Sequence, residues 1–255
     1  MQLRFLYLLC CFPVICYAQD QTLSSEKATN IHKVITTFRY YTGDMDKMAD
    51  VISFPLRRQY PVPAIKDEAA FRQRFSEVFD STLITMIAQS DVSQWTEMGW
   101  RGIMLGNGVI WMDGWDGKIT AVNYESDYEK ALRQELIARD KDSLHQSLQH
   151  FERPVYKIRT RHYLVRIDEL SEHIYRYASW KIPAAASSEP DLVLSNGTWE
   201  FEGTGGNHVI IFVNGAFTYK IYRNIIGVED APDITLEVEK DGQRIMTEGG
   251  TLILE

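Results

Sequence analysis

The stretch from Thr96 to Tyr124 constrains the fold most, because two turn signals divide it into three runs of β-like residues. The first signal is Gly106–Gly108. The second is Asp116–Gly117, a dipeptide that readily adopts the positive φ angles of a tight hairpin turn. We therefore expect a three-stranded antiparallel meander on which the upstream helices pack. The three runs are Thr96–Leu105, Val109–Asp113 and Lys118–Tyr124.

Four segments before the meander carry apolar residues at helical spacing, which predicts helices with one buried face each. Asp44 and Asp67 precede two of them, and Asp80 or Ser81 precedes another; all are suited to cap helix N-termini. Phe54–Pro63 contains three prolines and is expected to be extended. The apolar stripes are Ile31, Val34, Ile35, Phe38 and Tyr41; Met45, Met48, Ala49 and Ile52; Phe71, Phe75, Val78 and Phe79; and Leu83, Ile84 and Ile87.

From Pro154 onward the sequence reads as short β-strands separated by turn signals. Asn214–Gly215 and Asp241–Gly242 are strong hairpin signals, and Trp199 and Phe201 share one face of an alternating run. Several short strands with regular turns predict a small antiparallel barrel or sandwich. The expected strands are Pro154–Ile167, His173–Ile182, Thr198–Glu202, His208–Val213, Ala216–Tyr222, Ile234–Glu239, Arg244–Thr247 and Thr251–Leu254.

The first residues have the features of a secretory signal peptide: Arg4, an apolar run from Phe5 to Ile15, and a small residue, Ala18, at the expected cleavage site. That run is shorter than the ~20 apolar residues of a membrane span. The alternatives are an uncleaved anchor and a lipoprotein signal; Ile15 before Cys16 is too bulky for the latter. We expect an exported, periplasmic protein without a transmembrane segment in its mature chain.

Cysteine usage and charge exclude several classes of function. All three cysteines lie in the expected signal peptide, so the mature chain would have no disulfide, thiolate nucleophile or cysteine metal ligand. The net charge of −8 disfavours non-specific nucleic-acid binding.

The order of helix, helix, extended FPLRR, helix and GNGVIW…DGKITAVN meander resembles the NTF2-like cone fold over Glu26–Glu125. The resemblance implies helices closing over a curved antiparallel sheet, a scaffold that hosts isomerases, dehydratases and plain binding modules. Exported bacterial proteins of this type often carry a β-rich C-terminal part, which Asn196–Tyr219 resembles. That part is also loosely similar to periplasmic lysozyme inhibitors, although such inhibitors commonly use a disulfide.

The expected fold class is therefore α+β: NTF2-like helices on a curved antiparallel sheet, followed by a small all-β antiparallel barrel or sandwich. We expect a signal peptide over residues 1–18 and an NTF2-like domain over 19–126. A charged connecting helix should occupy 127–153 and a β-rich domain 154–255.

The glycine loop that ends in Gly205, Gly206, Asn207 and His208 is one candidate site for a ligand or partner. Its glycines would let backbone amides approach an anion or a sugar. It lacks the Gly-Lys-Ser/Thr end of a phosphate-binding loop and precedes a strand, so an inter-strand turn is the alternative interpretation.

The meander supplies the other candidates. Trp111 and Trp115 could stack on a ligand or anchor a partner, with core filling as the alternative for Trp111 and exposure expected for Trp115. Asn123 follows Ile119 and Ala121 at alternating positions. It would then face the interior of the cone and need a hydrogen-bond partner such as Arg57.

No catalytic constellation, metal motif or cofactor motif is recognisable: the sequence contains neither HExxH nor a G-x-S-x-G elbow. We therefore predict no catalytic residues, metal or cofactor. The function favoured by the sequence is a non-enzymatic, exported binding protein of the bacterial cell envelope with a protein or envelope-component partner. The alternative is a small-molecule-binding protein or enzyme that uses the interior of the NTF2-like cone.

Overall fold

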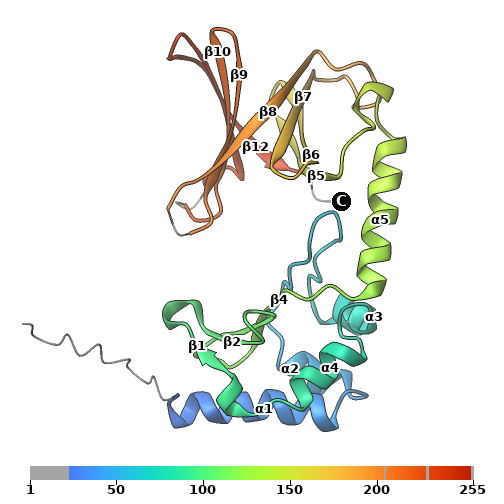
Figure 1. Ribbon diagram of the computed structural model, residues 1–255, viewed down its shortest axis with the longest axis vertical. Helices are drawn as coiled ribbons and strands as arrows, with labels where there is room; N and C mark the ends of the chain where they lie inside the picture. Colours follow the sequence, from blue (N-terminus) through green and yellow to red (C-terminus); the bar gives the residue numbers. More distant parts are fainter. Residues whose placement is uncertain (1–22, 204, 228–229, 254–255) are drawn as a thin grey trace, which may run out of the picture.

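The computed structural model describes residues 23–203, 205–227 and 230–253, so the expected signal peptide lies outside the described residues. The chain forms a helix-and-sheet part and a β-barrel, joined by the helix α5 (Asp127–Asp142), as Figure 1 shows. Among the described residues, no helix has the length and apolar character that crossing a membrane requires.

The N-terminal part begins with four helices whose starts follow the sequence signals. The predicted caps are confirmed for three of them: the side chains of Asp44, Asp67 and Asp80 accept hydrogen bonds from backbone amides three residues later. Ser24 caps the first helix in the same way. The helices are α1 (Ser25–Tyr40), α2 (Met45–Asp50), α3 (Glu68–Val78) and α4 (Ser81–Ala88).

The meander forms a four-stranded antiparallel sheet in the order β1-β2-β3-β4. The prediction of a single strand over Thr96–Leu105 is wrong. This segment forms two short antiparallel strands, β1 and β2, joined by a turn. Gly99 and Gly102 have φ angles of 62° and 97°, which side-chain-bearing residues rarely adopt. A Cβ on Gly102 would lie 2.4 Å from the carbonyl oxygen of Met112. The strands are β1 (Thr96–Glu97), β2 (Ile103–Leu105), β3 (Ile110–Met112) and β4 (Ile119–Val122).

The C-terminal part is a closed barrel in which each strand pairs antiparallel with the next and β12 pairs with β5. The closure selects a barrel over the sandwich alternative, and both predicted hairpin turns, at Asn214–Gly215 and Asp241–Gly242, are confirmed. The strands are β5 (Arg153–Thr160), β6 (Tyr163–Ser171), β7 (Ile174–Lys181), β8 (Leu192–Phe201), β9 (His208–Asn214), β10 (Phe217–Arg223), β11 (Ile234–Lys240) and β12 (Gln243–Leu252).

Four barrel strands, β5, β6, β8 and β12, differ from the sequence expectation. Pro154–Ile167 is not one strand but the β5–β6 hairpin, whose turn has neither glycine nor proline. The Thr160 hydroxyl supports this turn by accepting from the Tyr163 backbone amide at 3.0 Å. Strand β8 begins at Leu192 instead of Thr198, and β12 is continuous where two short strands were predicted.

Helix α5 ends at Asp142, before the end of the connecting helix predicted over residues 127–153, and its only two buried residues among those described are charged. Near its start, Glu129 is paired with Arg58 of the N-terminal part. Near its end, Asp140 accepts from Arg166 at 2.6 Å and lies 2.7 Å from the Lys157 ammonium, both on barrel strands. Burial alone would raise the pKa of Asp140, but these two cations lower it below its ordinary value. Buried charge thus fixes the helix to both parts.

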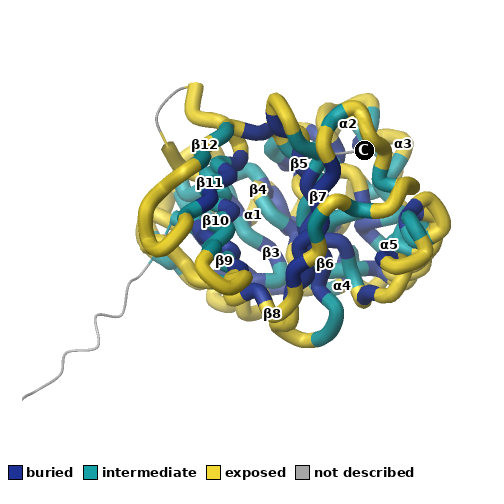
Figure 2. The backbone as a smooth tube through the Cα atoms, turned by 90° about the horizontal axis from the view of Figure 1, so that it is seen from above, coloured by how far each residue is buried: buried dark blue, intermediate teal, exposed yellow. Residues whose placement is uncertain are grey.

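Strand β7 is buried on both faces, which is visible as the dark stretch near its label in Figure 2. Its inward residues Tyr175 and Tyr177 belong to the barrel core. Its outward residues Ala178 and Trp180 pack under the segment that follows α5. The outer residues that complete this second cluster are Leu144, Leu148 and Phe151.

Candidate functional site

The barrel has an apolar middle and two ends that differ from each other. Apolar side chains that alternate along the strands fill the middle of the barrel. Phe212 fits there because its partner strand β8 carries Gly197, where a Cβ would lie 2.4 Å from the Phe212 ring.

An aromatic cluster closes the end of the barrel near the β8–β9 loop. The Trp199 indole stacks on the His208 imidazole, with ring centroids 3.8 Å apart, and the Tyr156 ring is stacked with both. Nδ1 of His208 lies 2.8 Å from the carbonyl oxygen of Gly206, which can only accept. Nδ1 therefore carries the proton, and Nε2 accepts from the Tyr156 hydroxyl at 2.7 Å.

The ionisation of this cluster agrees with its hydrogen bonds. Burial lowers the pKa of His208 below its usual value and raises the pKa of Tyr156 to about 12. At neutral pH the imidazole and the phenol are therefore both uncharged. This agrees with a hydrogen bond between two neutral groups, the Tyr156 hydroxyl and Nε2 of His208. The closed end is a neutral plug.

The opposite end opens into a cavity of about 520 Å³, which we call the barrel cavity. The size is within the range typical of small-molecule sites. Its residues come from the ends of β7 and β11 and the starts of β6, β8, β10 and β12, which meet at one rim in this topology. In Figure 1 this rim includes the β9–β10 turn and lies away from the N-terminal part. The lining residues are Tyr163, Tyr177, Ser179, Lys181, Asp191, Leu192, Phe217, Tyr219, Leu236, Val238, Ile245 and Met246.

Aromatic rings dominate the deep part of the barrel cavity. Tyr177 is 2% exposed, and its ring centroid lies 5.7 Å from those of Tyr219 and Phe212. Burial raises the pKa of both tyrosines above the ordinary value, so their hydroxyls stay protonated and can donate or accept. Lys181 and Asp191 bring one charge of each sign to the rim. The cavity suits an uncharged, largely apolar molecule.

The glycine loop lies at the closed end. Asn207 holds it against the β10–β11 loop: its Oδ1 accepts from the amides of Ile225 and Ile226 at 2.8 Å, and its Nδ2 donates to the Ile226 carbonyl. A Cβ on Gly205 would lie 2.7 Å from the Ile226 side chain. Asn207 and His208 are therefore engaged within the barrel, as the inter-strand-turn interpretation requires.

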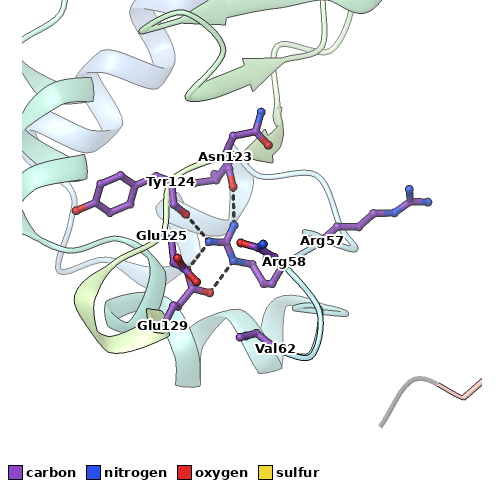
Figure 3. Close-up of a pocket in the computed structure, with 9 residues that line it drawn as sticks. Arg57, Arg58, Val62, Asn123, Tyr124, Glu125 and Glu129 are labelled. Atoms are coloured by element: carbon purple, nitrogen blue, oxygen red, sulfur yellow. Dashed lines mark hydrogen bonds and ion pairs between the residues drawn. The ribbon is translucent and has the colours of Figure 1, made fainter. Parts of the chain in front are cut away.

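Arg57 and Asn123 line a different pocket of about 390 Å³ where α5 meets the N-terminal part (Figure 3). The centre of this pocket is Arg58, whose guanidinium binds Glu129 and donates to the carbonyls of Val122 and Tyr124 at 2.6 Å. Arg57 is exposed and its side chain points away from that cluster. The groups that define the pocket thus satisfy one another.

The expectation that Asn123 faces the interior is wrong. A β-bulge in β4 pairs Ile119 with Met112 and Val122 with Ile110, so Val122, not Ala121 or Asn123, turns inward after Ile119. Asn123 is exposed and donates to the Gly108 carbonyl at 2.8 Å.

The two candidate tryptophans differ in exposure. Trp111 is half-buried on the face of β3 opposite to Ile110 and Met112, which are fully buried, so it does not fill the core. Trp115 is 90% exposed in the β3–β4 turn, as predicted. The structure brings Arg57 and Asn123 to one pocket and the glycine loop to another region, and it leaves both tryptophans outside those sites.

Sequence reasoning missed the residues of the barrel cavity. Tyr163, Tyr177 and Tyr219 are far apart in the chain, and each is an ordinary strand residue by itself. The available signal was alternation, Tyr175 with Tyr177 and Phe217 with Tyr219, which places rings on one strand face.

No group of histidine, cysteine, aspartate or glutamate within the described ranges could hold a metal ion. Comparison with protein-family models, with curated proteins and with solved structures found no match.

Proposed function

We propose that this protein is an exported, non-enzymatic binding protein whose barrel cavity holds a small, uncharged, ring-containing molecule. One observation carries the proposal: the barrel is plugged by Trp199, His208 and Tyr156 at one end and open at the other to a tyrosine-lined cavity. Barrels of eight strands have an interior of the size that can hold one small ligand.

The lining supports both affinity and orientation. Phe217, Tyr163 and Tyr219 offer ring faces and edges for offset or edge-to-face contacts with an aromatic ligand. Protonated phenols can hydrogen bond a ligand hydroxyl or carbonyl. A ligand of ~20 non-hydrogen atoms that gains ~0.3 kcal/mol per atom would bind with ~6 kcal/mol, a Kd of tens of micromolar.

The experiment is a titration with the neutral fluorescent probe N-phenyl-1-naphthylamine, comparing two adjacent residues of β8. Leu192→Trp places an indole in the barrel cavity, whereas Val193→Trp adds it at the neighbouring position, which is 43% exposed and does not line the cavity. We expect at least about tenfold weaker binding for Leu192→Trp and less than about twofold change for Val193→Trp. Equal binding by both variants, or no binding by the unaltered protein, would refute the proposal.

We further propose that residues 26–125 are an NTF2-like domain that acts as a scaffold. Four helices whose buried residues share one apolar core with those of a short antiparallel sheet support this. Its interior is filled by apolar side chains such as Phe38, Phe71 and Ile119, so we assign ligand binding to the barrel and not to the cone. An experimental structure with a sheet too flat to enclose an interior would argue against this fold family.

Export and a cell-envelope partner belong to the same proposal and rest on the signal-like features at Arg4, Phe5–Ile15 and Ala18. N-terminal sequencing of protein recovered from the periplasm should start at Gln19. Recovery of the intact Met1 form from the cytoplasm alone would contradict it.

A further inference from the structure

A second hollow lies at one end of the N-terminal sheet, where the β1–β2 turn and the β3–β4 turn come together beside the start of α1. Its volume is about 420 Å³. Trp100 from the first turn and Trp115 from the second contribute the aromatic surface, and Glu26, Lys27, Glu97 and Asp113 contribute the charged groups. We call this hollow the tryptophan groove.

The two indoles are unusually open to solvent. Trp100 is 80% and Trp115 is 90% exposed, more than any other large hydrophobic residue described in the structure. Both are held by local backbone geometry. Gly99, with φ of 62°, precedes Trp100, and the Asp113 carboxylate accepts from the Trp115 backbone amide at 2.6 Å. The two turns therefore expose indole surface that packs neither in the core of the N-terminal part nor in the core of the barrel.

The charges in the groove are unbalanced. Lys27 forms a 2.6 Å ion pair with Glu97, which compensates one of the three carboxylates. Within the described residues, Glu26 and Asp113 have no cationic partner. Arg101 is the cation next to Trp100 in the sequence, but it does not line the groove. The lining therefore carries a net negative charge beside two indole rings.

We propose that the tryptophan groove binds an organic cation, either a quaternary ammonium group or a protonated alkylamine. Indole is the strongest aromatic partner for a cation, and cages of aromatic rings are a recurrent way to bind quaternary ammonium. The carboxylates of Glu26 and Asp113 add Coulomb attraction and select against anions. A neutral sugar could stack on the indoles but would leave these two carboxylates without a countercharge. The proposal does not depend on the barrel cavity.

The first test compares choline with 3,3-dimethylbutan-1-ol, its uncharged isostere, by calorimetry and by the change in tryptophan fluorescence. We expect choline to bind at least about tenfold more tightly than the isostere. N-acetylglucosamine serves as the neutral sugar. Equal binding of choline and the isostere, or tighter binding of the sugar, would overturn the proposal.

The second test removes a single charge from neighbouring carboxylates. Asp113→Asn and Asp116→Asn each keep an oxygen that can accept the turn's backbone hydrogen bonds, but only Asp113 lines the groove. We expect about fivefold weaker choline binding for Asp113→Asn, a change below about twofold for Asp116→Asn, and about tenfold weakening for Trp115→Ala. Equal losses in both asparagine variants would indicate a diffuse electrostatic effect and refute the site.

Discussion

The N-terminal part and the barrel both have apolar cores, but they enclose space differently. In the N-terminal part, helices contribute long side chains such as Phe38 and Phe71, which pack with the buried residues of the sheet and fill the interior. The barrel has no such helix inside, so only its own strands can fill it. At the open rim, tyrosines line a cavity. The same residue types thus form a filled interior in the N-terminal part and line a cavity in the barrel.

The two parts also use buried charge in the same way, at opposite ends of one helix. Glu129 and Asp140 both lie on α5, one facing Arg58 and the other facing Lys157 and Arg166. A helix that is polar on all sides can bridge two bodies in this manner. We infer that α5 fixes the distance between the N-terminal part and the barrel. Its 16 residues span about 24 Å.

The largest expected effect comes from opening the filled core. Phe79 is 1% exposed and its ring centroid lies 5.2–6.0 Å from those of Phe38, Phe71 and Phe75. Phe79→Ala should lower the free energy of unfolding of this part by about 4 kcal/mol, because the rings around the new cavity cannot collapse fully. Urea titration measures it. Phe201→Ala, at a position 72% exposed, is the control and should cost less than about 1 kcal/mol. A loss below 1 kcal/mol for Phe79→Ala would mean that this core is not closely packed.

A smaller effect is expected from the bridge between the parts. Arg58→Met leaves the Glu129 carboxylate, 2% exposed, without its partner, which should destabilise the protein by about 3 kcal/mol. The double variant Arg58→Met/Glu129→Leu removes both charges and should recover at least about half of that loss, as measured by urea titration. Arg139→Met, which disrupts the exposed pair of α5 with Glu135, should change stability by less than about 0.5 kcal/mol. No recovery in the double variant would show that the carbonyl contacts of Arg58 matter more than its ion pair.

Local signals predicted much of this fold. Helix caps such as Asp67 and the hairpin at Asn214–Gly215 depend on residues a few positions apart, so the sequence alone could locate them. The bulge that turns Asn123 outward could not be located, because alternation assumes an unbroken register. The β5–β6 turn was missed because it contains neither glycine nor proline.

Non-local geometry decided the candidate site. The barrel closes through pairs such as Gly250 with Thr160, which are far apart in the chain and carry no recognisable pairing signal. Without that closure, Tyr163 and Tyr219 would not line the same cavity. The exposure of Trp115 was predictable because it lies between turn residues, whereas the neighbouring position of Trp100 required the unforeseen β1–β2 turn.

Removing one tyrosine hydroxyl from the barrel cavity should weaken ligand binding more than it lowers the stability of the protein. Tyr219→Phe removes a cavity hydroxyl but keeps the ring, so we expect about fivefold weaker binding of 2-naphthol and unchanged binding of naphthalene, from one lost hydrogen bond of about 1 kcal/mol. Calorimetry measures both ligands. Tyr222 lies on the same strand but does not line the barrel cavity, so Tyr222→Phe should change neither affinity. Equal weakening of both ligands would indicate a change in cavity shape and not a lost hydrogen bond.

A pH-dependent effect on stability is expected from the plug that closes the barrel. Because burial lowers the pKa of His208, the unfolded chain takes up a proton at a higher pH than the folded chain does. The stability from the neutral imidazole is therefore fully present above the unfolded pKa of about 6.5 and decreases as the pH falls below it, by at most about 1.4 kcal/mol per pH unit. Urea titrations between pH 7.5 and 5.5 should show this slope in the unaltered protein and in the control His173→Gln, whose imidazole is 80% exposed. The slope should be reduced in His208→Gln. An equal slope in His208→Gln would assign the pH dependence to other groups and leave the plug without a role in it.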